Sequence, residues 1–180
     1  PDGTVDCYKA RLVAKGFHQQ EGIDFQDTFS PVAKPVTIRI LLSLVVQHNW
    51  FLNQLDINNA FLHGDLKEDV YILQPPGFID PLFPSHVCKL QKSLYGLKQA
   101  PRAWFEKLFQ ALQDLGFHQS SSDASLFVLN GSQLVIVIVY VDDILITGPN
   151  SHLCHQFIQQ LSKGSWSFTL FLRAGSPAIF

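Results

Sequence analysis

Apolar residues follow a helical spacing in three stretches of the chain. Residues 36–50 are almost continuously apolar and long enough for a buried helix, which Pro35 would begin. Residues 101–115 carry large apolar side chains every three or four positions, and Gly116 follows them as a helix-ending glycine. A last helix is expected over residues 152–162, where apolar residues recur every four positions.

Shorter apolar runs, bounded by turn residues, predict strands. The expected strands cover residues 7–14, 51–57, 70–73, 125–129, 133–140 and 144–147. Residues 78–87 are expected to form a loop. Helices and strands interleave, and the last two strands are close enough to form a hairpin. This order predicts an α+β fold with an antiparallel sheet and helices packed on one face of it.

The composition is that of a folded chain, because 47% of the residues are apolar and 15 Phe with 3 Trp can fill a core. The formal net charge is only −2, so a nucleic-acid interface would need a local basic patch. The longest apolar run, residues 134–141, is far shorter than the roughly 20 residues that cross a membrane. The chain begins with Pro1 and contains no Met, so we expect it to be a piece of a longer protein.

Two adjacent carboxylates, Asp142 and Asp143, lie between two strongly apolar strands. A solvated turn is the simpler interpretation, because Asp is common in turns. A buried carboxylate needs a partner, however, and a hard divalent cation would serve as one. Asp56 lies near the end of another apolar strand. Three such carboxylates can hold two Mg²⁺ ions for phosphoryl chemistry if their strands are neighbours, which the pattern alone does not establish.

From about residue 8 to about residue 161 the chain resembles the reverse transcriptase domain of copia-type LTR retrotransposons. The resemblance rests on six blocks in the family's order: YKARLVAKGF at 8–17, GIDF at 22–25, TFSPV at 28–32, QLDINNAFLHGDL at 54–66, SLYGLKQAPRAW at 93–104 and YVDD at 140–143.

The resemblance implies a right-hand polymerase without its thumb. Residues 1–34 and 66–98 would form the fingers, and residues 35–65 and 99–163 the palm. Residues 164–180 are unlike the family, and we expect a divergent tail produced by a frameshift or splice. Because a thumb holds the primer, we expect weak or absent activity from the isolated chain.

The resemblance also assigns roles to residues. Asp56, Asp142 and Asp143 would be catalytic and, with the backbone carbonyl of Ile57, would hold two Mg²⁺ ions, for which Mn²⁺ could substitute. The dNTP would be bound by Lys9, Arg11, Phe61 and Tyr95. Phe61 would exclude a ribose 2′-hydroxyl, although it could also be an ordinary core residue. The template–primer would be bound by Gly96, Lys98, Gln99, Arg102 and Tyr140.

The implied partners are an RNA template, a DNA primer and dNTPs, with no membrane. Integrase, RNase H and protease domains would share the original polyprotein. Copying would occur in cytoplasmic virus-like particles before a nuclear step. Two alternatives stay open: a catalytically inactive remnant, and another two-metal enzyme such as an integrase or RNase H. Members of that second class lack a Tyr-x-Asp-Asp hairpin.

Overall fold

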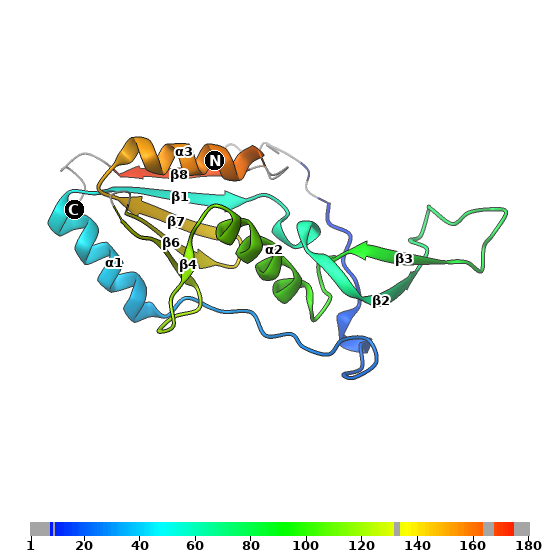
Figure 1. Ribbon diagram of the computed structural model, residues 1–180. Helices are drawn as coiled ribbons and strands as arrows, with labels where there is room; N and C mark the ends of the chain where they lie inside the picture. The colour runs from blue at the N-terminus through cyan, green and yellow to red at the C-terminus, as the bar shows by residue number, and fades with distance from the viewer. Residues whose placement is uncertain (1–7, 9, 132–133, 164–167, 175–180) are drawn as a thin grey trace, which may run out of the picture.

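The computed structural model describes residues 8, 10–131, 134–163 and 168–174 (Figure 1). Its helices are the 3₁₀-helices η1 (Gly16–His18) and η2 (Ala60–His63) and the α-helices α1 (Pro35–His48), α2 (Ala100–Asp114) and α3 (Ser151–Lys163). Its strands are β1 (Phe51–Ile57), β2 (Asp65–Leu73), β3 (Val87–Lys92), β4 (His118–Gln119), β5 (Leu126–Leu129), β6 (Val135–Tyr140), β7 (Asp143–Gly148) and β8 (Phe168–Ala174). Mixed helices and antiparallel sheet confirm the expected α+β class.

The strands that the structure describes form two separate sheets. Six of them lie in the order β4-β5-β6-β7-β1-β8, and every neighbouring pair is antiparallel. The other two, β2 and β3, form a ribbon that extends away from the larger sheet (Figure 1). Among the described residues, no helix has both the length and the apolar character needed to cross a membrane.

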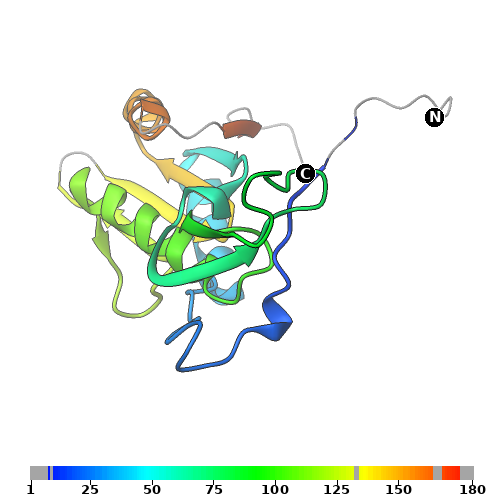
Figure 2. The ribbon, with the colours of Figure 1, turned by 90° about the vertical axis from the view of Figure 1, so that its right-hand side faces the viewer.

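Helices cover both faces of the six-stranded sheet. Along β6, Val137 and Val139 belong to the core built with α2 and α3, whereas Ile138 packs with Leu41 of α1 on the other face. This division follows from the alternation of side chains along a strand. Figure 2 shows α3 end-on, with α2 below it. The expectation of helices on one face was therefore wrong, because strands that are apolar on both faces must be covered on both.

The three expected α-helices are confirmed to within two residues at each end. In α2, Trp104 is 1% exposed and Leu108 and Leu112 are fully buried, so the helical spacing identified the core face correctly. Gly116 follows the helix with a φ of 89°, a conformation that suits glycine at a helix end.

The strand expected over residues 7–14 is not formed by the described part of that segment. Val13 makes an isolated bridge with Tyr95, and the Ala14 N–H donates to the Tyr95 carbonyl at 2.7 Å. The segment runs past the β2–β3 ribbon without joining it (Figure 1). An alternating pattern becomes a strand only where a neighbouring strand provides a ladder of hydrogen bonds.

Three strands, β3, the two-residue β4 and β8, were not expected from the sequence pattern. β3 follows the loop expected over residues 78–87, and its partner β2 starts at Asp65, earlier than residue 70. β8 lies within the segment expected to be a divergent tail, and it pairs with β1. β1 therefore has a hydrogen-bonded neighbour on each side, which places Asp56 inside the sheet.

A buried carboxylate joins the start of α1 to the turn before β5. Asp123 is 4% exposed and accepts hydrogen bonds from the Thr37 hydroxyl at 2.6 Å, the Ser125 hydroxyl at 2.7 Å, and the N–H groups of Ser125 and Lys34. Burial by itself raises the pKa of Asp123, but these four hydrogen bonds outweigh it and lower the pKa to about 2.

Acid is expected to destabilise the protein through Asp123. The folded-state pKa, about 2, is below the ordinary value of 3.8, so the stabilisation is complete above about pH 4 and is lost as pH falls towards 2. The shift corresponds to about 2 kcal/mol of unfolding free energy. Urea unfolding should show Asp123→Asn to be weaker than the unsubstituted chain at pH 7 and nearly equal to it at pH 2. Asp27→Asn, at an exposed carboxylate, is the control, and equal losses from both substitutions would contradict the prediction.

Candidate active site

The β6–β7 hairpin turns through two residues, Val141 and Asp142, and the first of them is strained. Val141 has a φ of 59°, and of the two turn residues it alone has a positive φ. A positive φ at the first central position is the mark of a type II′ turn, which normally has glycine there. A β-branched residue in this conformation costs about 1–3 kcal/mol, so the turn must be held by its surroundings.

Two hydrogen bonds from outside the hairpin hold the turn. The Ile57 N–H, at the end of β1, donates to the Asp142 carbonyl at 2.9 Å. The indole Nε1–H of Trp104, in α2, donates to the Val141 carbonyl at 2.7 Å. Ile57 and Trp104 are each 1% exposed, so water competes little for these donors. The neighbouring strand and a core helix therefore position the hairpin tip together.

Asp56, Asp143 and Tyr140 form one row across three strands, and we call these residues together with the adjoining Asp142 the acidic row. Asp143 is the direct antiparallel partner of Asp56 in β1 and of Tyr140 in β6. Directly opposed residues share one face of a sheet, so the two carboxylates lie on the same face. Gln54, two positions before Asp56 in β1, donates from Nε2 to Asp143 Oδ1 at 3.0 Å. The fold thus makes neighbours of the two strand ends that carry the acids.

The donor chemistry of this row suits hard divalent cations, which prefer carboxylate and carbonyl oxygens. Asp56 and Asp143 are half-buried and Asp142 is exposed at the tip. Within the described parts of the chain, no basic side chain forms an ion pair with Asp142 or Asp143.

Among the described residues, the carboxylates do not by themselves form a complete metal-coordination site. In the described ranges, no three Asp, Glu, His or Cys side chains are close enough to hold a metal ion by themselves. Repulsion between like charges keeps carboxylates apart until a cation neutralises them. The residues therefore fit Mg²⁺ as oxygen donors, and the ions would have to complete the arrangement.

Three of the four residues expected to bind a dNTP lie together. The Phe61 ring meets the Tyr95 ring edge-on, with centroids 5.3 Å apart, and the Arg11 guanidinium carbon lies 5.8 Å from the Tyr95 centroid. The buried Ser93 hydroxyl donates to the Phe61 carbonyl. Phe61 is half-buried and packs against the core. Lys9 lies outside the described residues.

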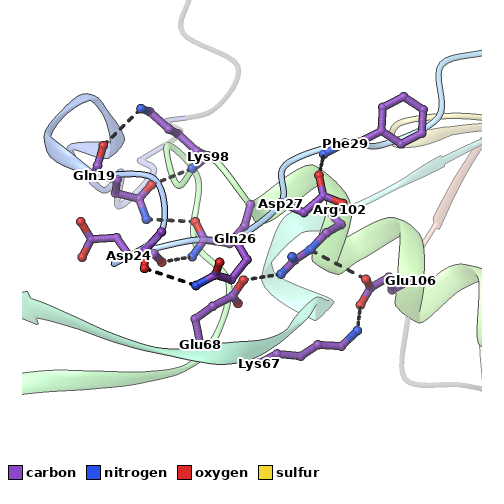
Figure 3. Close-up of polar contacts among 12 residues, drawn as sticks. Gln19, Asp24, Gln26, Asp27, Phe29, Lys67, Glu68, Lys98, Arg102 and Glu106 are labelled. Atoms are coloured by element: carbon purple, nitrogen blue, oxygen red, sulfur yellow. Dashed lines mark hydrogen bonds and ion pairs between the residues drawn. The ribbon is translucent and has the colours of Figure 1, made fainter.

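Three polar side chains, those of Gln19, Lys98 and Gln99, fasten the N-terminal segment to the start of α2 (Figure 3). Gln99 Nε2 donates to the Asp24 carbonyl at 3.0 Å, and Gln99 Oε1 accepts from Gln19 Nε2 at 2.9 Å. Lys98 donates from its N–H to Gln19 Oε1 and from Nζ to the Gln19 carbonyl. Gln99 is fully buried, whereas Lys98 is exposed. Of these two expected template–primer residues, the structure leaves only Lys98 at the surface.

Gly96 allows the same segment to approach closely. Its φ is 87°, and a Cβ built on it would lie 2.2 Å from the Ala14 carbonyl oxygen. Gly16 faces it, and a Cβ there would lie 1.8 Å from the Gly96 carbonyl oxygen. Both positions therefore need glycine for packing.

Arg102 forms a buried ion pair between α2 and β2 (Figure 3). Its Nη2 lies 2.6 Å from Glu68 Oε1, and the two side chains are 11% and 12% exposed. Its Nε lies 3.8 Å from Glu106 Oε1, one helical turn further along α2. The guanidinium, expected at the template–primer, is thus held by Glu68 within the protein.

Gln54 contacts Asp143 in the acidic row and Trp104 contacts Val141 in the adjoining turn, but neither was singled out from the sequence. Gln54 could have been found, because a residue two positions before Asp56 lies on the same face of the strand. Trp104 gave no local signal beyond that of a core residue, because its hydrogen bond spans 37 residues. Tyr140, expected at the template–primer, is 48% exposed at the end of the row.

Known proteins resemble this chain over most of its length. Residues 2–170 match the profile of the family described as reverse transcriptase (RNA-dependent DNA polymerase), past residue 163 and into β8. The chain is 56% identical over 163 residues to the retrovirus-related Pol polyprotein from transposon RE1 of Arabidopsis thaliana, and 52% identical to that from transposon RE2. It is 46% identical over 164 residues to the Pol polyprotein from transposon TNT 1-94 of Nicotiana tabacum. These matches cover 88–90% of this chain but only 11–12% of each relative.

Proposed function

The chain belongs to the reverse transcriptase (RNA-dependent DNA polymerase) family, with Pol polyproteins of copia-type transposons as relatives, and we propose that it carries the catalytic centre of such a polymerase. One observation carries the proposal: Asp56 and Asp143 are direct partners on adjacent strands, and Asp142 stands beside them on the hairpin tip. A solvated turn would need neither this register nor the hydrogen bonds that hold the strained turn.

The proposed reaction extends a primer by one nucleotide. The primer 3′-hydroxyl oxygen attacks the α-phosphorus of a dNTP, the bond to the β-phosphate oxygen breaks, pyrophosphate leaves, and the hydroxyl proton is lost to solvent. Asp56, Asp142 and Asp143 would hold two Mg²⁺ ions, with the Ile57 carbonyl as a further oxygen donor. Bound there, the ions would make the hydroxyl more acidic and neutralise charge on the triphosphate.

We propose that Arg11, Tyr95 and Phe61 form one side of the nucleotide site. Stacking against Tyr95 orients the Arg11 guanidinium, whose fork of donors suits phosphate oxygens. Lys9 would add a second cation. Phe61, whose backbone is held by Ser93, would exclude a ribose 2′-hydroxyl by steric contact.

We also propose the division into fingers and palm. The six-stranded sheet with its helices would be the palm, built from residues 35–65 and 99–163. The β2–β3 ribbon and the N-terminal segment, within residues 66–98 and 1–34, would be the fingers, and Figure 1 supports this by showing the ribbon apart from the sheet. An RNA template and DNA primer would contact the exposed Gly96, Lys98 and Tyr140, while the buried Gln99 and Arg102 would shape that surface from within.

Primer extension tests the proposal. The chain, in excess over a poly(rA)–oligo(dT) substrate and with Mg²⁺, is expected to add dTMP and to discriminate against UTP, and chelation should stop the addition. Excess protein compensates for weak binding of the template–primer. If folded protein binds the substrate but adds nothing, this chain is an inactive remnant of the family and the proposal fails.

A further inference from the structure

The indole of Trp104 connects three parts of the candidate site. Trp104 is the fifth residue of α2 and is 1% exposed. Its ring centroid is 6.0 Å from that of His63 in η2, the 3₁₀-helix that also contains Phe61. Gly64 permits the backbones of η2 and α2 to approach closely, because a Cβ at that position would lie 2.7 Å from the backbone nitrogen of Trp104. The indole Nε1–H then reaches the Val141 carbonyl at the hairpin tip, at 2.7 Å.

The hairpin tip needs such a contact. Val141 has a φ of 59°, which a β-branched residue adopts only where neighbouring groups impose it. One imposed contact comes from the Ile57 backbone, which any residue except proline would provide. The other comes from a side chain, and tryptophan is the apolar aromatic residue that carries a ring N–H.

Loss of the hydrogen bond from Trp104 to Val141 would affect Asp142 more than Asp143. Asp143 has its own support from Gln54, at 3.0 Å, and from pairing with Asp56 and Tyr140. Asp142 lies in the turn itself, so its direction depends on the conformation of Val141.

We propose that Trp104 is a positioning residue: its indole N–H holds the strained Val141 peptide so that Asp142 faces the metal-binding side of the acidic row. The inference rests on the proposed function, because it assumes that the row binds divalent cations. Without the N–H, the Val141 carbonyl loses a part-buried partner, the turn relaxes and Asp142 turns away.

Manganese titration followed by NMR tests this without requiring catalysis. Bound Mn²⁺ is expected to broaden the backbone amide signals of Asp56, Asp142 and Asp143 in the full chain. Trp104→Phe keeps an aromatic ring in the core but removes the donor, and should need about tenfold more Mn²⁺ for the same broadening. Trp50→Phe, at a half-buried tryptophan outside the row, should titrate like the unsubstituted chain.

Repeating the Trp104→Phe substitution in a chain that carries Val141→Gly separates an effect on the turn from a general effect on packing. Val141→Gly relieves the strain at φ 59°, so adding Trp104→Phe to it should weaken Mn²⁺ binding by much less than tenfold. A full tenfold loss in that background would overturn the inference, because the indole would then act on something other than the strained turn.

The remaining outcomes distinguish the inference from the function on which it rests. If Trp104→Phe titrates like the unsubstituted chain while Asp142→Asn, Asp143→Asn loses the broadening, the inference fails and the metal site stands. If the unsubstituted chain shows no broadening at these amides, the metal site and the inference fail together.

Discussion

Replacing Asp142 and Asp143 together with asparagine is expected to lower primer extension by at least about a thousandfold. Asparagine keeps the size of each side chain but removes the charge that would hold Mg²⁺, and metal stabilisation of a transition state is worth several kcal/mol. Single-turnover extension of oligo(dT) on poly(rA), with protein in excess, measures the effect directly.

Folding should survive this substitution. Removing two neighbouring negative charges relieves repulsion, so the thermal unfolding temperature should stay the same or rise slightly. Asp114→Asn, at the exposed end of α2, is the matched control and should leave extension unchanged. Extension within tenfold of the unsubstituted chain in the double variant would place the catalytic centre elsewhere.

Arg102→Met is expected to lower the free energy of unfolding by about 3–5 kcal/mol, because it leaves the Glu68 carboxylate buried without its cation. One oxygen of Glu68 and the Nε of Arg102 are buried without a hydrogen bond even in the intact pair. Few other polar groups could therefore stabilise the Glu68 carboxylate after the guanidinium is removed. Urea unfolding at neutral pH measures the loss, provided that the free energy of unfolding depends on urea concentration with the same slope in both proteins.

The double variant Arg102→Met, Glu68→Met should recover most of that stability, because it removes both charges and leaves apolar chains of similar length. Lys67→Met is the control for an exposed ion pair, because Lys67 pairs with Glu106 and its side chain is 70% exposed. This substitution should lower the free energy of unfolding by less than about 1 kcal/mol. A cost for Arg102→Met as small as that of Lys67→Met would show that the pair between α2 and β2 contributes little.

Elements with strong local periodicity were predictable from the sequence. The three α-helices and the strands around Asp56 and Asp143 were expected nearly where they occur, because large apolar residues repeat at the spacing of each structure. The segment before Gly16 also alternates, but its described residues make only the isolated bridge between Val13 and Tyr95 and do not form a strand. β3 and β4 were missed because they are short and carry few large apolar residues, and β8 was missed because residues 164–180 were interpreted as a divergent tail.

The sequence by itself determined which residues could do the chemistry, because carboxylates between apolar strands and six blocks in a family's order are local properties of the chain. The tertiary structure alone decided which of these residues meet. It made β1 and β7 neighbours in the register that opposes Asp56 to Asp143, directed Arg102 to Glu68, and brought Trp104 to Val141. Such contacts join residues far apart in the chain, and only the packing of helices on both faces of one sheet brings them within hydrogen-bonding distance.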